Sequence, residues 1–503
     1  MNRTSPLPHK ALTQTVFYSV LFSLLAHGYR FLNMSFSGDA SLIAQTEDTV
    51  FQIAIGRFLQ PVYWAVRGPL TAPLTIGLFA TAALTGAAIL TVSLLNLTSR
   101  RAILLVCGML ATNETLSVSC ATYLPWVDVY MMAFFFSIAG VYISARTRHG
   151  WLLSPVLYLV TLALYQSYLQ TAVVLSLMLL ILRLLDGERV GDIALSGVKT
   201  CLSLLISLLL YAAASRLVLA ALGLTASDNY NGISRVGMMP LDEVPDLLLS
   251  TFLYPFRFFA RDADSAFIPP LLTLLLLLLS LPALLVPALR LSPGQKAMLA
   301  FLLVMLPLGA NFVAFISQGI VHPLMVYAFF FLYILCVALW ERARPNWKGL
   351  WRSAGTAAML ITALMLGQNI VTANQLYLRR DLEFYSTTSA ATRILKHADQ
   401  VEGYVPGETP VCVLGYLPSS KIGFVRPGFE ALSNLQGMRY TYAASYETST
   451  QWYFEMILGY PMNFVSPEER DALVSSGVGD TLPAYPNENC CQLIDGVLFI
   501  RLS

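Results

Sequence analysis

One polar segment near the start of the chain, residues 37–68, carries the side chains best suited to chemistry. Its charged residues are three acids and two arginines: Asp39, Glu47, Asp48, Arg57 and Arg67. A carboxylate can take a proton from an attacking hydroxyl, and a guanidinium can bind two oxygens of a departing phosphate. The alternative is structural: Asp39 caps a helix that begins near Ala40, and Glu47 and Asp48 are solvated.

Asp39 is the first candidate for the general base. It directly follows an apolar run, and Gly38 before it frees the backbone. Glu47 and Asp48 come second, since one of them can orient an acceptor or bind a metal.

Polar side chains also interrupt apolar runs further along the chain: Asn113, Glu114, Asp128, Tyr165, Gln166 and Gln170. Carboxylates inside such runs are often functional. We predict substrate contacts from Asn113, Asp128, Tyr165 and Gln166. Two alternatives stay open: Asp128 caps a helix behind a Pro-Trp turn, and the polar groups of 165–170 only hold helices together.

The sequence lacks the motifs of several common enzyme classes. The chain has no Walker loop, no G-x-S-x-G, no HExxH and no C-x-x-C spacing. This disfavours an ATP-driven pump and a soluble-type hydrolase. The sequence points to no particular cofactor, and the need for a divalent metal stays open.

The composition places the chain in a membrane. Of its 503 residues, 56% are hydrophobic and 12% are charged, whereas soluble domains carry roughly 25% charged residues. A lipid bilayer removes the cost of exposing so much apolar surface. The net charge of only +2 argues against a nucleic-acid partner.

Apolar runs of spanning length predict about eleven transmembrane helices. They lie near 11–33, 71–97, 102–122, 126–145, 151–165, 167–185, 200–222, 268–289, 297–317, 323–340 and 353–373. The run 151–185 can be two short spans or one long broken helix. The stretch 49–67 is too polar at its ends to span, so we expect one interfacial helix, kinked at Pro61.

Basic residues orient these helices. With eleven spans, all six basic clusters between them fall on one side, which the positive-inside rule makes cytoplasmic. The clusters are Arg3/Lys10, Arg100/Arg101, Arg146/Arg148, Arg183/Arg189/Lys199, Arg290/Lys296 and Arg342/Arg344/Lys348/Arg352. The N-terminus is then inside, and the C-terminus and residues 37–68 are outside.

The tail has a different composition. We predict two domains, a transmembrane domain at 1–373 and a small α/β domain outside the membrane at 374–503. Strand-like runs occur at 411–414 and 496–502, and a helix-like stretch lies at 387–399. An oxidising compartment would allow a disulfide from Cys412 to Cys490 or Cys491, and three buried thiols are the alternative.

Five stretches resemble the type II O-antigen glucosyltransferase family of bacteria and their phages. They are HGYRFLN (27–33), GRFLQPVYWAVRG (56–68), LATNETLSV (110–118), TYLPWVDVYM (122–131) and LALYQSYLQ (162–170). The resemblance implies a membrane-embedded C-type glycosyltransferase (GT-C-like) fold in a bacterial inner membrane. It also implies transfer of a sugar, typically glucose, from a polyprenyl-phosphate carrier to a surface polysaccharide on the periplasmic face.

Enzymes of this type usually place an essential carboxylate in the first outer loop, where Asp39, Glu47 and Asp48 match. Any paired-Asp motif is absent or displaced, because Gly38 and Ala40 flank Asp39. The implied reaction is a single displacement that inverts the anomeric carbon. The competing hypotheses are a transporter or flippase of lipid-linked sugars, and an assembly partner of a polysaccharide polymerase. Transporters often contain internal repeats. The 37–68 pattern occurs once in this sequence, which favours the enzyme over the transporter.

Overall fold

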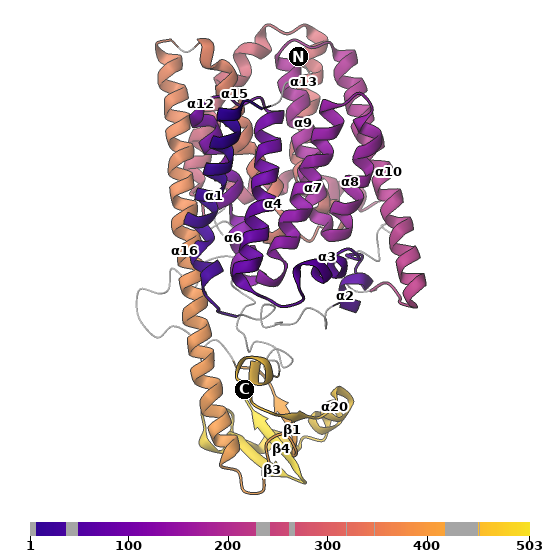
Figure 1. Cartoon of the computed structure of the whole chain (residues 1–503), viewed down its shortest axis with the longest axis vertical. Coiled ribbons are helices and arrows are strands. Elements are labelled where there is room, and N and C mark those ends of the chain that lie inside the picture. The colour runs from indigo at the N-terminus through magenta and orange to yellow at the C-terminus, as the bar shows by residue number, and fades with distance from the viewer. Residues whose placement is uncertain are drawn as a thin grey trace. The chain divides into compact units, whose positions relative to one another are not determined.

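The computed structural model describes residues 7–36, 49–227, 242–260, 267–317, 319–346, 348–417, 451 and 453–503 (Figure 1). These residues are mostly helical, with one small sheet near the C-terminus. They form two compact units. The first holds most of the described residues up to Asn374, and the second holds those of 375–503 together with 33–36 and 121–125.

The helices that precede the sheet are α1 (His9–Leu32), α2 (Thr49–Ala54), α3 (Gln60–Arg67), α4 (Pro73–Leu94), α5 (Arg100–Thr112), α6 (Glu114–Thr122), α7 (Val127–Arg146), α8 (Gly150–Leu164), α9 (Leu169–Leu185), α10 (Val190–Leu222), α11 (Val244–Ala260), α12 (Pro270–Leu289), α13 (Pro293–Ala310), α14 (Phe312–Ile316), α15 (Phe331–Ala343) and α16 (Leu350–Asp399). Short 3-10 turns are η3 (Leu124–Trp126), η4 (Gln166–Tyr168), η6 (Pro323–Met325) and η7 (Tyr327–Phe330).

Among the described residues, eight helical stretches are long and apolar enough to cross a membrane. They are Pro73–Leu94, Arg100–Thr122, Leu124–Arg146, Gln166–Leu185, Val190–Leu222, Pro270–Leu289, Pro293–Ala310 and Leu350–Asp399. The predicted spans at 11–33, 151–165 and 323–340 are helical too, but these helices are shorter or less apolar. A mostly helical protein with several helices long and apolar enough to span a membrane is therefore confirmed, whereas the count of eleven and the GT-C-like fold stay predictions.

The run 151–185 consists of two helices. α8 ends at Leu164, Tyr165 has extended backbone angles (φ −161°, ψ 110°), and η4 leads into α9. A similar break separates α5 from α6 at Asn113, whose amide oxygen accepts from Leu116 N at 3.0 Å. Asn113 thus caps the second helix of that pair.

The prediction of one helix over 49–67, kinked at Pro61, is wrong. The chain forms two short helices, α2 and α3, separated near Gly56, whose φ of +84° favours glycine. Pro61 lies in the first turn of α3, where a missing N–H costs nothing. The separate helices predicted at 353–373 and 387–399 are likewise one continuous helix of 50 residues, α16.

Contacts between loops gather the basic clusters at one end of the first unit, the end that holds the N-terminus in Figure 1. Ser99 Oγ donates to Glu341 at 2.6 Å, and Arg342 lies 3.6 Å from Asp186. Gln295 reaches the Glu188 carbonyl at 2.9 Å. The loops after α4, α9, α12 and α15 therefore meet at this end, as the positive-inside assignment requires.

In the second unit the sheet contains β1 (Pro410–Leu414), β2 (Asn463–Phe464), β3 (Cys491–Ile494) and β4 (Val497–Arg501), in the order β2-β1-β4-β3. β1 is parallel to β2 and β4, and β3 is antiparallel to β4. One face packs Val411 and Val413 against Ile394 and Ala398 at the end of α16. Both strand runs predicted from the sequence are confirmed.

The predicted disulfide is not formed. Adjacent residues of a strand face opposite sides of a sheet. Cys412 packs with Phe499 and Leu482 on one face, whereas Cys490 and Cys491 belong to the cluster on the other face. All three are buried thiols, which was the alternative.

Candidate functional site

The segment that carries Arg57 and Arg67 is held against the break between α8 and α9. Leu59 N donates to the Ala163 carbonyl at 3.2 Å, and the Gln60 amide donates to the Leu164 carbonyl at 2.7 Å. Because α8 stops at Leu164, these carbonyls lack helical partners and are available to accept. The two irregular segments therefore satisfy each other's backbone groups.

Arg67 and Asp128 form a buried ion pair. Arg67 Nη1 lies 3.1 and 3.2 Å from the two carboxylate oxygens, and the two side chains are 1% and 0% exposed. Tyr63 donates to the same carboxylate at 3.0 Å, and Val129 N donates to it as well. A carboxylate with this many donors positions its neighbours and is badly placed to take a proton from a substrate.

Tyr63 is the residue of this group that sequence reasoning missed. Tyr63 and Arg67 are four residues apart, so both lie on one face of α3. This spacing, in a helix that contains Arg67, was the available signal. Burial, together with the nearby Asp128 carboxylate, raises the pKa of Tyr63 above its usual range, so the phenol stays protonated and donates.

Arg57 lies in a second cluster, built from α2, η4 and α10. Its guanidinium contacts the amide oxygens of Gln52 at 3.2 Å and Gln166 at 3.4 Å, and it lies 4.7 Å from the centre of the Tyr165 ring. Gln166 also donates to the Ile55 carbonyl at 2.9 Å. Two amides and an aromatic face thus fix the orientation of one cation.

Tyr211 completes the second cluster, with its hydroxyl 3.0 Å from the Gln166 amide nitrogen. It lies in the middle of α10, within an apolar run, and no local pattern in the sequence marks it. Only the packing of α10 beside α2 brings it to this site.

Tyrosine rings extend this cluster towards η7. Tyr165 lies 4.3 Å from Tyr130 between ring centres, and Tyr168 lies 5.6 Å from both Tyr165 and Tyr327. The Tyr168 hydroxyl and the Gln170 amide oxygen are buried without a hydrogen-bond partner among the described residues. Buried polar atoms of this kind are rare and suit a ligand that supplies hydroxyl groups.

The structure thus brings together five predicted site residues in two adjacent clusters: Arg67 with Asp128, and Arg57 with Tyr165 and Gln166. Asn113 contacts Leu110 O at 2.8 Å and Leu116 N at 3.0 Å, and its side chain also hydrogen-bonds Tyr327 of the tyrosine cluster. Asp39, Glu47 and Asp48 lie outside the described residues, so their roles stay predictions. Over the part of the chain that is described, no group of three or more His, Cys, Asp or Glu side chains can hold a metal.

A family model described as Glucosyl transferase GtrII matches residues 28–335, more than half of the chain. The chain belongs to this family. Membership makes it a glucosyltransferase, whose reaction moves a glucosyl group from a donor to an acceptor. No curated protein and no solved structure matches the chain.

The region matched by the GtrII family contains both clusters. It begins within α1, ends within α15 and covers all the predicted site residues. The C-terminal sheet lies outside the match. The chemistry that the family shares is therefore expected in the first unit and the segment that precedes α2.

Proposed function

We propose that the protein transfers glucose, with inversion, from a polyprenyl-phosphate carrier to a surface polysaccharide such as O-antigen, at the periplasmic face of the bacterial inner membrane. The observation that carries the proposal is the pair of arginine clusters within the GtrII match, directly after an acidic segment. A lipid-phosphate donor needs a cation for its leaving group and a base for the attacking hydroxyl, and this order of residues offers both.

In the proposed reaction, the acceptor oxygen attacks the anomeric carbon as its proton passes to a first-loop carboxylate. The bond from the anomeric carbon to the phosphate oxygen breaks, and the polyprenyl phosphate leaves with the electron pair. Asp39 is the first candidate for the base, with Glu47 and Asp48 after it. One displacement inverts the anomeric centre, so no second nucleophilic carboxylate is needed.

Arg57 and Arg67 are the two candidates that the sequence offers for the phosphate ligand, and their contacts favour Arg57. The Arg67 guanidinium already binds both oxygens of a buried carboxylate. Arg57 is held by neutral amides and by the Tyr165 ring. We assign Arg67 and Asp128 to positioning α3, and Tyr165, Gln166 and the neighbouring tyrosines to the sugar.

An apolar cavity supports a lipid-linked donor. It has a volume of about 760 Å³ and is lined by α9, α11, α12, α13 and α15, with Phe256, Phe259 and Phe329 in its wall. Ala328 and Phe329 follow Tyr327 directly, so the cavity adjoins the tyrosine cluster. A cavity of this size and lining suits part of a polyprenyl chain.

The test is transfer of radiolabelled glucose from synthetic polyprenyl-phosphate glucose to the polysaccharide by the purified full-length protein. Asp39→Asn keeps the shape of the side chain, and removal of a general base costs about 10²- to 10⁴-fold in rate. Glu47→Gln and Asp48→Asn are assayed in parallel, and the exposed Glu402→Gln is the matched control.

Three results would decide between the hypotheses. Loss of transfer in Asp39→Asn alone assigns the base to Asp39, whereas loss in one of the other two moves it there. Full rates in all three variants reject the first-loop mechanism. Movement of the lipid-linked sugar across vesicles without transfer supports the flippase instead.

A further inference from the structure

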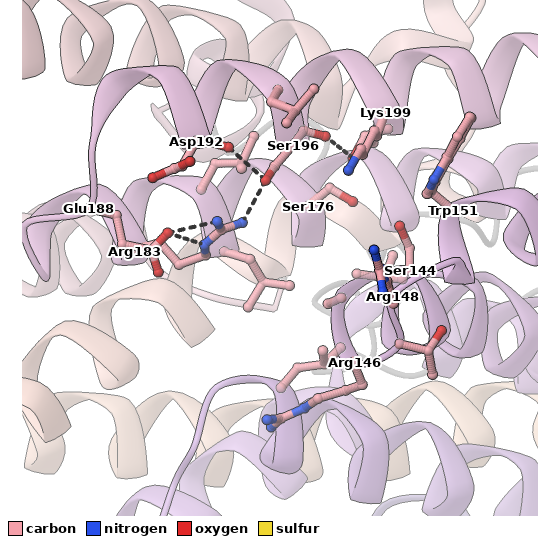
Figure 2. Close-up of a pocket in the computed structure, with 18 of the residues that line it drawn as sticks. Ser144, Arg146, Arg148, Trp151, Ser176, Arg183, Glu188, Asp192, Ser196 and Lys199 are labelled. Carbon is pink, nitrogen blue, oxygen red and sulfur yellow. Dashed lines mark hydrogen bonds and ion pairs between the residues drawn. The ribbon is translucent and has the colours of Figure 1, made fainter. Parts of the chain in front are cut away.

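A second cavity lies far along the helices from the arginine clusters, at the end of the first unit that holds the basic loops. It has a volume of about 460 Å³ and lies between the ends of α7, α8, α9 and α10 (Figure 2). Its charged lining consists of five basic and two acidic side chains: Arg146, Arg148, Arg183, Lys199, Arg342, Glu188 and Asp192. The glucosyl transfer proposed above uses none of them.

Three of the five cations already have partners. Arg183 binds Glu188 at 2.7 and 2.9 Å and also donates to Ser196 at 3.1 Å. Arg146 donates to Asn96 at 3.2 Å, and Arg342 lies 3.6 Å from Asp186. These contacts fix the walls of the cavity.

Arg148 and Lys199 have no hydrogen-bond or ion-pair partner among the described residues, although both line the cavity. Figure 2 shows them on the side of the cavity that holds Trp151, away from the Arg183–Glu188 pair. Ser144 and Ser176 add hydroxyl groups to the same lining. Two cations with hydroxyl donors beside them suit an anion that has several acceptor oxygens, such as a phosphate group.

The surface around Lys199 indicates where the phosphate comes from. Leu195, Val198 and Leu202 on α10 are 54%, 55% and 42% exposed, and Leu152 and Leu153 on α8 are exposed as well. In a membrane these side chains face lipid tails. A phosphate bound at Lys199 would therefore have acyl chains beside α8 and α10.

We propose that this cavity binds the phosphate headgroup of an anionic membrane lipid, with Arg148 and Lys199 as the phosphate ligands. Basic pockets between transmembrane helices are a recognised form of headgroup site. Trp151, at the start of α8, suits the headgroup level of the bilayer. The inference is independent of the transfer reaction.

The test measures lipid retained by the purified full-length protein, using native mass spectrometry with dioleoyl phosphatidylglycerol and, separately, dioleoyl phosphatidylcholine. The Arg148→Gln/Lys199→Gln double variant removes both ligands. Arg290→Gln/Lys296→Gln removes two exposed charges at the same end outside the cavity and is the matched control. Arg148→Lys/Lys199→Arg keeps the charge.

We expect phosphatidylglycerol affinity to fall about tenfold or more in the double Gln variant, since two charge-assisted contacts are lost. The control and the charge-keeping variant should retain wild-type affinity. Equal retention in the double Gln variant and the wild type would overturn the proposal, as would equal affinity for phosphatidylcholine. Inorganic phosphate that binds the wild type where phosphatidylglycerol does not would assign the cavity to a soluble anion instead.

Discussion

At the scale of single residues, the chemistry of the first unit depends on buried charges that are paired with an opposite charge. Arg67 and Asp128 are almost fully buried, and Tyr63 and Val129 N share the carboxylate. Taking one charge out of such a pair leaves the other without compensation, and this costs far more than the pair contributes when intact. The sequence suggested two separate ligands here, and the structure joins them.

The ion pair makes a direct prediction. Asp128→Asn and Arg67→Gln should each lower the free energy of unfolding by about 3–5 kcal/mol, because each leaves one buried charge unpaired. The double variant should regain a large part of the loss, since both groups are then neutral. Thermal unfolding in a mild detergent measures the effect, with the exposed Arg290→Gln as the control. Additive losses in the double variant would show that the two side chains act independently.

At the scale of elements, the site is made by segments that fail to continue as helices. α8 stops at Leu164 and α2 stops before Gly56, and each exposes backbone groups that the other segment binds. Two continuous helices would have satisfied these groups internally. The breaks therefore create the positions of Arg57 and Gln166.

Gly56 is the residue on which the break between α2 and α3 depends. A Cβ at this position would lie 2.0 Å from the Tyr211 hydroxyl, and φ is +84°. Gly56→Ala should therefore displace Tyr211 and Gln166, reduce transfer sharply and destabilise the protein by about 1–3 kcal/mol. Gly68→Ala is the matched control, because its φ is +100° but no atom lies within 4 Å of its Cβ. If both variants lose transfer equally, backbone strain explains the loss and the Tyr211 contact does not.

The turn before η6 predicts a dependence of stability on pH. His322 accepts from Leu324 N at 3.2 Å, and burial lowers its pKa from 6.5 to about 4. The unfolded chain therefore binds a proton at His322 more readily than the folded chain does. The stability that the neutral side chain contributes is present above pH 6.5 and is lost as pH falls towards 4. The full loss is about 3 kcal/mol.

His322→Asn tests this prediction, because asparagine keeps an acceptor for the turn and does not titrate. The unfolding temperature of the wild type should fall between pH 6.5 and 4, and that of the variant should fall less. The same measurements at pH 7.5 serve as the reference. Parallel curves for the two proteins would show that other groups cause the fall.

At the scale of the whole molecule, one prediction concerns orientation. The basic loops meet at one end of the first unit through contacts such as Ser99–Glu341 and Arg342–Asp186. We expect this end in the cytoplasm and the tail, residues 374–503, in the periplasm. A phosphatase fused after Ser503 should be active, and one fused after Arg148 should be inactive. An inactive fusion after Ser503, with a cytoplasmic reporter active there, would contradict the odd number of spans and the periplasmic domain.

The long apolar helices and the strands β1 and β4 followed from the sequence because each depends on local composition. The long apolar runs allowed only helices in a bilayer, and the strands at 410–414 and 497–501 were marked by β-branched and aromatic residues. The family resemblance also needed only short motifs, and the GtrII match confirms it. The break near Gly56 was missed because Pro61 is the stronger local signal, although proline is well tolerated in a first helical turn.

The pairing of side chains was decided by tertiary structure. Arg67 and Asp128 are 61 residues apart, and Tyr211 reaches Gln166 across 45 residues. No local pattern encodes such contacts, because they depend on which helix faces pack together. The disulfide is a further example. The sequence allowed a bond from Cys412 to Cys490 or Cys491, but the fold places Cys412 on one face of the sheet and the other two on the opposite face.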